Sequence, residues 1–300
     1  MQRREIPARL AGSILLPATV YVTPRRPCKR LPPCGVSLLL SCCKLVSVFP
    51  NADSDRLRVI LVAPRNPLNI GAAARAMSNF GFFHLRVVNP YELAFREARS
   101  AVGAAPLLTR AEEFKSLAEA VEDCTLVIGT TAVGQRQLQH PVRRLDQAAR
   151  LFGKWLAGGR VALLFGSEKR GLSNEDLSHC HWLLRIPTRE EHRSMNLGQA
   201  VGIVIYELSR GSSLVSAKNK LARSAADMET VHRINAALLE ALHISGYVHP
   251  RSAATAQEKL RRMLLRFDLS AADAEVFLGM LRKILWKLHE RLSGGKSEPL

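Results

Sequence analysis

From residue 58 to residue 210, short apolar segments rich in β-branched residues alternate with segments of helical character. The apolar segments occupy residues 58–63, 84–88, 125–129, 161–165 and 182–186. The segments with helical character occupy residues 69–80, 111–121, 145–155 and 196–210. Short buried strands that alternate with helices are typical of a mostly parallel sheet covered on both faces. The sequence therefore predicts an α/β fold whose main domain spans residues 55–210.

A second unit is predicted after this domain. Residues 211–229 are rich in Ser, Ala, Lys and Arg and have no sustained apolar face, so we interpret them as a linker. Apolar residues then recur at helical spacing in three stretches, which predicts a small, separate helical bundle over residues 230–292 and a disordered tail over residues 293–300. Four cations flank the apolar stripe of the middle helix, either as an ordinary solvated face or as an RNA contact. They are Lys259, Arg261, Arg262 and Arg266.

The first fifty residues have a different composition, with eight Lys and Arg, one acidic residue, seven of the 15 prolines and four of the six cysteines. A transit peptide and a secretory signal each fit this composition in part. However, the prolines interrupt any amphipathic helix, and the apolar stretch lies too far from the N-terminus for an ordinary signal. We interpret residues 1–54 as a disordered leader, or as upstream sequence included by a misplaced start codon.

The cysteines lack the paired CxxC spacing of a zinc site, so no metal is expected. Cys124 and Cys180 stand alone in periodic segments. Because each lies in a segment with regular apolar spacing and has no second cysteine nearby in the sequence, we predict that both are buried free thiols in a reducing compartment.

The chain is strongly basic, with 43 Lys and Arg against 26 Asp and Glu and a formal charge of +17. Such a charge favours a polyanionic partner, either a nucleic acid or an anionic membrane surface, although basic surfaces also serve solubility. No apolar run reaches the roughly 18 to 20 residues that a membrane-spanning helix needs. We therefore expect RNA or DNA as the partner and no membrane.

Ligands of such sheets collect outside the carboxyl ends of the strands, so a site is expected in the loops that follow the strands. The first of these loops leads into a helix that carries Asn69, Gly71 and Arg75. A helix N-terminus presents free N–H groups to an anion, and an arginine about one and a half turns further on can extend a guanidinium to a phosphate. The alternative is a capping Asn66 and an ordinary surface arginine.

The second loop, FGSEKRGLSNEDL, combines Gly166 and Gly171 with Glu168. Glycines permit positive φ and a close approach of the backbone to a ligand. The loop lacks the GxxxxGK[ST] pattern, and no GxGxxG follows any strand, so neither a nucleoside triphosphate nor a dinucleotide is indicated. Part of the loop is structural, because Ser173 or Asn174 can cap the short helix that follows.

The third loop leads into SMNLGQAVGIVIYEL, where Ser194 is the expected N-cap and Asn196 lies in the first turn.

Taken singly, each of the three loops is explained by capping and turn formation. Together they have the order and spacing found in the SpoU/TrmH branch of the SPOUT superfamily, whose members are RNA ribose methyltransferases. NPLNIGAAARAM resembles motif 1 of this branch, LLFGSEKRGLSNEDL motif 2 and IPTREEHRSMNLGQAV motif 3.

The resemblance covers residues 58–210 without a large gap. Within the branch it is greatest to the TrmJ enzymes, for two reasons. The chain enters the first strand directly after the leader, and KLRRMLLRFDLSAADAEVFLGMLRKIL resembles the helical extension of those enzymes.

The resemblance implies a SPOUT fold, in which the parallel sheet ends in a deep trefoil knot that also makes a homodimer. It implies S-adenosyl-L-methionine as the cofactor, bound by the knot mainly through backbone groups. The implied cofactor-binding residues are Thr130, Thr131, Ala132, Gly166, Ile186, Ser194, Met195, Asn196 and Leu197.

The implied activity is methylation of a ribose 2'-hydroxyl in tRNA, at the cytidine or uridine in position 32 of the anticodon loop, and the implied location of the protein is the cytoplasm. The implied catalytic residues are Arg75, Asn69, Glu168, Ser194 and Asn196. Motif 1 of one protomer would supply Asn69 and Arg75 to a site completed by motifs 2 and 3 of its partner. Because a guanidinium stays protonated, we expect Arg75 to hold a phosphate and stabilise the developing alkoxide rather than to act as a base.

Residues 191–193, Glu-His-Arg, depart from the TrmJ pattern just before motif 3 and leave substrate selection open. Ribosomal RNA or another tRNA position is therefore an alternative substrate. A different class of function is an RNA-binding or assembly protein that has lost the activity, although the implied catalytic residues are all present.

Overall fold

The structure is a computed structural model that describes residues 54–92, 95, 106–132, 139–149, 151–212 and 224–294. The predicted leader lies outside these residues except for Ser54. Most of the predicted linker and of the predicted tail also lie outside them.

A seven-stranded sheet forms the centre of the fold, with the strand order β3-β2-β1-β6-β4-β7-β5. Every pair of neighbouring strands in it is parallel. The strands are β1 (Leu57–Val62), β2 (Leu85–Val88), β3 (Glu112–Phe114), β4 (Leu126–Thr131), β5 (Val142–Arg144), β6 (Val161–Phe165) and β7 (Trp182–Arg185). The predicted α/β fold with a parallel sheet is confirmed.

Alternate residues of the central strands enter two separate cores, one on each face of the sheet. In β1, Val59 and Leu61 belong to the first core, whereas Ile60 and Val62 belong to the second. Successive side chains of a strand point to opposite faces, so a strand covered on both faces must be apolar at every position. This requirement explains the continuous apolar runs of the sequence.

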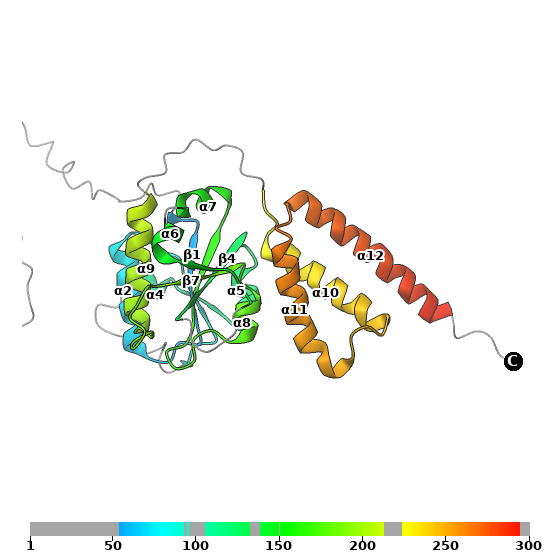
Figure 1. Cartoon of the computed structure of the whole chain (residues 1–300), viewed down its shortest axis with the longest axis horizontal. Helices are drawn as coiled ribbons and strands as arrows, with labels where there is room; N and C mark the ends of the chain where they lie inside the picture. The colour runs from blue at the N-terminus through cyan, green and yellow to red at the C-terminus, as the bar shows by residue number, and fades with distance from the viewer. Residues whose placement is uncertain are drawn as a thin grey trace, which may run out of the picture. The chain divides into compact units, whose positions relative to one another are not determined.

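Helices cover both faces of the sheet (Figure 1). The first face is covered by α2 (Pro67–Asn79), α4 (Pro106–Thr109), α6 (Leu145–Ala149), α7 (Phe152–Gly158) and α9 (Leu197–Ser212). On this face α2 and α9 lie side by side. The second face is covered in part by α5 (Leu117–Val121) and α8 (Asn174–Ser178).

Helix α2, which carries motif 1, begins and ends as its sequence predicts. The side chain of Asn66 accepts a hydrogen bond from the N–H of Leu68 (2.9 Å), and Pro67 occupies the first helical position. Gly81, with φ of 79°, follows the C-terminal end.

Two of the predicted helices are wrong in detail. Residues 112–114 of the predicted helix 111–121 form the edge strand β3, which pairs with β2, so only α5 is helical. The side chain of Ser116 accepts a hydrogen bond from the N–H of Glu119 (3.3 Å) and thereby sets the start of α5. The predicted helix 145–155 is divided into α6 and α7. Strand β5 is unpredicted because its sequence, VRR, contains no apolar run.

The C-terminal helices are α10 (Met228–Ile244), α11 (Ala253–Arg266) and α12 (Ala271–Gly294), with a 3-10 turn at Pro250–Ser252. The sequence predicts a separate bundle, but these helices share the second core with the sheet. For example, Met228 and Leu264 belong to the same core as Ile60. The N–H of Met228 also donates to the carbonyl of Cys124 (3.0 Å). The helices therefore pack together and also complete the cover of the second face.

The predicted state of two cysteines is confirmed. Cys124 and Cys180 are buried free thiols, and burial raises the pKa of both. In the part of the chain that the structure describes, no helix combines the length and the apolar character that crossing a membrane requires.

Candidate active site

A cavity of about 540 Å³ opens at the carboxyl ends of β4, β6 and β7. This edge is where open parallel sheets bind their ligands. The cavity is lined by Thr130, Thr131, Ala132, Phe165, Gly166, Ser167, Glu168, Lys169, Arg170, Gly171, Leu172, Leu177, Ile186, Thr188, Arg193, Ser194, Met195, Leu197 and Ala200.

Most of the expected cofactor-binding residues meet at this cavity. Those that line it are Thr130, Thr131, Ala132, Gly166, Ile186, Ser194, Met195 and Leu197. Of the expected catalytic residues, Glu168 and Ser194 also line it, whereas Arg75, Asn69 and Asn196 do not.

Asn69 joins motif 2 to motif 3 by two hydrogen bonds. Its Nδ2 donates to Oε1 of Glu168 (3.1 Å), and its Oδ1 accepts from Nδ2 of Asn196 (2.7 Å). In turn, Oδ1 of Asn196 accepts from the N–H groups of Gly198 (2.9 Å) and Gln199 (3.3 Å) in the first turn of α9. One chain of hydrogen bonds thus connects all three motifs.

This network corrects one expectation and bears on a second. Asn196, rather than Ser194, caps α9, because its oxygen accepts the free N–H groups at the start of the helix. Asn69 was expected to serve the site of a partner protomer, but both atoms of its buried amide are bonded within its own chain. A buried amide requires such partners, and motifs 2 and 3 supply them locally.

The carboxylate of Glu168 holds the loop that precedes α2. Its Oε2 accepts from the N–H of Arg65 (3.1 Å) and its Oε1 from the N–H of Asn66 (3.1 Å), in addition to Asn69. Burial by itself raises the pKa of Glu168. The hydrogen bonds from its own backbone, Asn69, Arg65 and Asn66 outweigh burial and lower that pKa below its ordinary value. Glu168 is therefore ionised at neutral pH and acts as a fixed hydrogen-bond acceptor.

Two glycines shape the loop of motif 2. The N–H of Gly171 donates to the carbonyl of Ser167 (2.8 Å), and Gly171 has a φ of 67°. A Cβ at Gly166 would lie 2.1 Å from the carbonyl carbon of Gly171. No side chain fits at position 166, so the loop can fold back on itself only with glycine there.

Arg75 lies on an exposed face of α2. Leu68, Ala72 and Arg75 share this face by their spacing, all three are exposed, and Leu68 is 79% exposed. On the neighbouring helix α9, Ile203 and Tyr206 are exposed as well. Arg75 therefore lies on an outer face of α2 that also carries exposed apolar side chains, and it does not line the cavity of its own chain.

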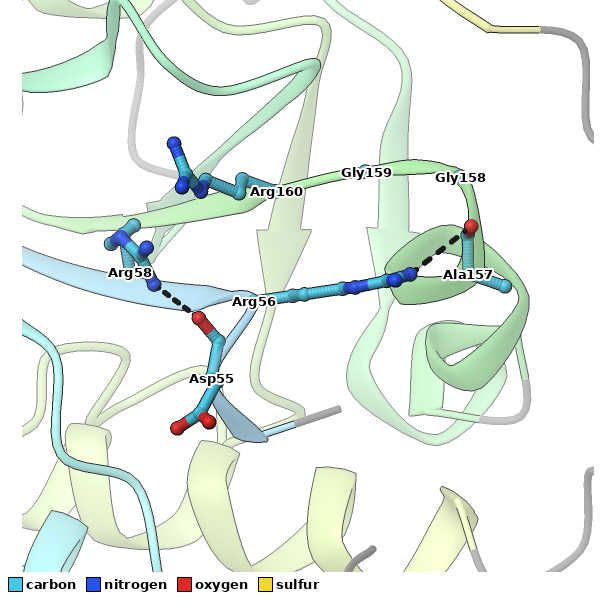
Figure 2. Close-up of a pocket in the computed structure, with 7 residues that line it drawn as sticks. All are labelled: Asp55, Arg56, Arg58, Ala157, Gly158, Gly159 and Arg160. Carbon is cyan, nitrogen blue, oxygen red and sulfur yellow. Dashed lines mark hydrogen bonds between the residues drawn. The ribbon is translucent and has the colours of Figure 1, made fainter. Parts of the chain in front are cut away.

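A second hollow, of about 480 Å³, lies at the amino-terminal ends of β1 and β6. Figure 2 shows Arg56, Arg58 and Arg160 beside it. Arg56 donates to the last carbonyls of α7 (2.8 and 3.3 Å), and Arg160 donates to Asp123 (3.1 Å). Burial opposes ionisation of Asp123, but its hydrogen bonds and charge interaction with Arg86 lower its pKa to about 2. These arginines thus have structural partners, and none of the three motifs contributes to the hollow.

Three further residues, Lys169, Arg170 and Arg193, also line the cavity and are not among the expected cofactor-binding or catalytic residues. Their position inside or beside motifs 2 and 3 is the signal that could have identified them. A cationic rim is suited to a polyanionic partner. Among the described residues, no group of three or more His, Cys, Asp or Glu side chains is placed to hold a metal ion.

The parallel sheet, the cavity lined by motifs 2 and 3, and the hydrogen bonds that join motif 1 to both motifs define an RNA-methylase type of domain. The chain belongs to the SpoU methylase family, since the SpoU rRNA Methylase family matches residues 56–206, from β1 into α9. The family predicted from the motifs is confirmed.

Relatives named TrmJ resemble the chain over most of its length. The tRNA (cytidine/uridine/adenosine-2'-O-)-methyltransferase TrmJ of Pseudomonas aeruginosa is 32% identical over 242 residues, which cover 76% of this chain and 93% of the relative. An uncharacterized tRNA/rRNA methyltransferase of Haemophilus influenzae is 32% identical over 236 residues, which cover 77% of this chain and 95% of the relative. The crystal structure of TrmJ from Z. mobilis ZM4 has a TM-score of 0.66 and 33% identity, and the match covers 76% of this chain and 98% of that chain. The predicted SPOUT fold and the predicted likeness to TrmJ are both confirmed.

Proposed function

We propose that this protein transfers a methyl group from S-adenosylmethionine to a ribose 2'-hydroxyl of tRNA, at the pyrimidine in position 32 of the anticodon loop. The observation that carries the proposal is the hydrogen-bonded connection of Glu168, Asn69 and Asn196 beside a cavity at the carboxyl edge of the sheet. The choice of tRNA is supported by relatives named as tRNA 2'-O-methyltransferases.

The cavity fits the proposed cofactor. Its volume of about 540 Å³ lies within the range of roughly 300–1,000 Å³ that small-molecule sites occupy. The apolar side chains of Ile186, Leu197 and Phe165 provide surfaces for a base, and loops of small residues leave backbone groups accessible. The hydroxyl of Thr130 already donates to the carbonyl of Leu164 (2.8 Å), so it can offer a ligand only an acceptor.

The bound cofactor would supply an electrophilic methyl group on a sulfonium. The residues of the chain must then align the 2'-hydroxyl and stabilise its developing negative charge. Arg75 is the proposed catalytic residue, because its guanidinium stays protonated and can hold the adjacent phosphate while stabilising the alkoxide. Glu168, Asn69 and Asn196 act as positioning residues that keep the three motifs in register.

The exposure of Arg75 supports a homodimer with a shared site. Arg75 lies outside the cavity of its own chain and shares the outer face of α2 and α9 with exposed apolar side chains. Such a face is buried when a second copy packs on it. In this dimer, Arg75 of one protomer would act at the cavity of its partner.

The test is methyl transfer from labelled S-adenosylmethionine to defined RNAs, followed by mapping of the modified ribose by mass spectrometry. We expect incorporation into a tRNA transcript with a pyrimidine at position 32 and none into the matched transcript with a 2'-deoxyribose there. Incorporation only into ribosomal RNA, or at another tRNA position, would replace the proposed substrate. Cofactor binding without transfer to any RNA would support the alternative of an inactive RNA-binding protein.

A further inference from the structure

Arg261 of α11 is a buried cation, only 7% exposed, and it forms no ion pair with any carboxylate of the described residues. Its Nη1 donates to Oγ of Ser178 (2.7 Å) and to Nε2 of His179 (2.7 Å). Nδ1 of His179 lies 3.2 Å from Nε2 of His232 on α10. The charges of Glu175 and Glu258 favour the ionised form of Arg261, but neither carboxylate forms an ion pair with it. Burying a charge without a close counter-ion is costly, so the hydrogen bonds of Arg261 require an explanation.

Arg261 determines the protonation pattern of this cluster. A guanidinium can only donate, so Nε2 of His179 must accept and its proton must lie on Nδ1. That proton is then donated to Nε2 of His232. The hydroxyl of Ser178 accepts from Arg261 and donates to the carbonyl of Glu175 (2.6 Å). The cluster is thus a directed chain of hydrogen bonds from α11, through the end of α8, to α10.

Helix α8 is continuous with the wall of the candidate cofactor cavity. Leu177 of α8 and Leu172, just before it, both line the cavity. Both leucines also belong to the second core, where they pack with Met228 and Leu264 of the C-terminal helices. A displacement of α8 would therefore change the shape of the cavity.

We propose that Arg261 is a positioning residue for the cofactor cavity. Its hydrogen bonds to Ser178 and His179 hold α8, and with it Leu172 and Leu177, in the arrangement that binds the cofactor. The C-terminal helices then act on cofactor binding directly, besides any contact with RNA. This inference rests on the proposed function in one respect, namely that the cavity binds S-adenosylmethionine.

Overall stability does not test this role. Replacing a buried charged residue by an apolar one of similar volume is often neutral or stabilising, because the cost of burying the charge disappears. The informative measurements are the affinity for the cofactor and the state of the two imidazoles.

The experiment compares Arg261→Met with Arg233→Met, a matched arginine replacement on the exposed surface of α10. The affinity for S-adenosylmethionine is measured by calorimetry on the full chain without RNA. We expect Arg261→Met to weaken binding about tenfold, the loss that one or two hydrogen bonds account for. Arg233→Met should bind as the unsubstituted protein does.

Nitrogen-15 NMR of the histidine side chains provides the readout that a merely structural role would not change. The unsubstituted protein should show neutral His179 with its proton on Nδ1, and Arg261→Met should lose this single tautomer. Arg261→Lys should restore the tautomer and part of the affinity, since an ammonium also donates to Nε2. If Arg261→Met does not fold, Ser178→Ala tests the same link from α8 and should weaken binding in the same direction.

Unchanged cofactor affinity in folded Arg261→Met, or in Ser178→Ala, would overturn the inference. This outcome is distinct from failure of the proposed function. If the unsubstituted protein binds S-adenosylmethionine and methylates no RNA, the proposed activity fails while the role of Arg261 is still measured. If the unsubstituted protein does not bind the cofactor at all, both are rejected.

Discussion

At the scale of single residues, Arg75 and Asn69 lie six positions apart on α2 and have opposite surroundings. Asn69 is buried and bonded to both other motifs, whereas Arg75 is exposed. The two residues therefore have separable effects. Asn69 acts through the geometry of the loops, and Arg75 acts through its charge on a substrate.

Replacing Arg75 by Ala should lower the rate of methyl transfer to tRNA roughly 100- to 1,000-fold, the effect of removing one donor to a developing negative charge. Cofactor affinity should be unchanged, because in the proposed site Arg75 contacts the phosphate and the reacting hydroxyl of the RNA rather than the cofactor. Single-turnover transfer and calorimetry measure the two quantities. Arg75→Lys should recover only part of the rate, because an ammonium lacks the planar fork that holds a phosphate. Full activity of Arg75→Ala would remove this residue from the mechanism.

At the scale of elements, the contact between α8 and α10 should make stability depend on pH. Burial lowers the pKa of His179 to about 2 and that of His232 to about 4, and the charge of Arg261 adds to both effects. Both imidazoles are therefore neutral in the folded state, whereas the unfolded chain binds protons near pH 6.5.

Because these folded pKa values are depressed, the contribution of the histidines is complete above pH 6.5 and is lost as the pH falls, toward about 4 for His232 and toward about 2 for His179. The free energy of unfolding should decrease with a slope that approaches about 1.4 kcal/mol per pH unit for each histidine. Urea unfolding between pH 7 and pH 4.5 measures the slope. His232→Gln should reduce it, since an amide oxygen can accept from His179 without titrating. An equal slope in this variant would contradict the assignment.

The basic face of α11 lies near His140, in the segment between β4 and β5. After burial, the largest causes of the low pKa of His140 are the charges of Arg262 and Arg266. This proximity brings α11 close to residue 140, which precedes β5 and lies in the segment that follows β4. The proposed RNA contact of the C-terminal helices consists of the exposed Lys259 and Arg266 and of Arg262, whose side chain is 13% exposed and pairs with Glu258 (3.6 Å).

The first variant replaces the three cations of α11, Lys259, Arg262 and Arg266, by Gln. It should bind tRNA more weakly. The slope of log affinity against log salt concentration should also fall by about 1 for each phosphate that the protein no longer neutralises. Cofactor affinity should be retained. Binding measured at several salt concentrations tests both statements. Neutralising three exposed cations of α12, Lys283, Lys287 and Arg291, is the control with an equal change of charge. Equal effects of the two triple variants would reject a specific role of α11.

At the scale of the whole molecule, the second core makes the C-terminal helices part of one folded unit with the sheet. Removing residues 230–300 would expose the second face of the sheet, including Ile60 and Leu164, and would destabilise the fold. A loss of RNA binding in such a truncated protein could then result from unfolding alone. Surface substitutions on α11 are therefore the appropriate test of RNA binding.

The proposed dimer predicts that a charge on the exposed face of α9 will weaken the association of two protomers. Tyr206→Asp places a charge on the exposed face of α9 and should shift the protein toward monomer, because burying an unpaired carboxylate in an interface is unfavourable. Methyl transfer should fall together with the dimer fraction if Arg75 acts across the interface. Sedimentation velocity and transfer assays over a range of protein concentrations measure the two quantities. A fully active monomer would refute the shared site.

Local sequence patterns predicted much of the fold. The apolar strands, the motif helices and the loops at the carboxyl edge follow from periodicity and capping residues, which act over a few positions. The exceptions have physical causes. Strand β5 is a short edge strand with one apolar residue, and the start of α5 is set by the hydrogen bond that the side chain of Ser116 accepts from the N–H of Glu119.

The sequence by itself determined the parallel α/β architecture, the family and the set of loops that form the cavity, because these depend on patterns within short segments. Only the tertiary structure decided which side chains are partners. Asn69 is bonded to residues 99 and 127 positions away, and Arg261 to a histidine 82 positions away. Hydrogen-bond partners at such separations are set by the packing of distant segments, for which a local pattern carries no signal. For the same reason, a helical unit that looked separate in the sequence proved to share the core that supports the cavity.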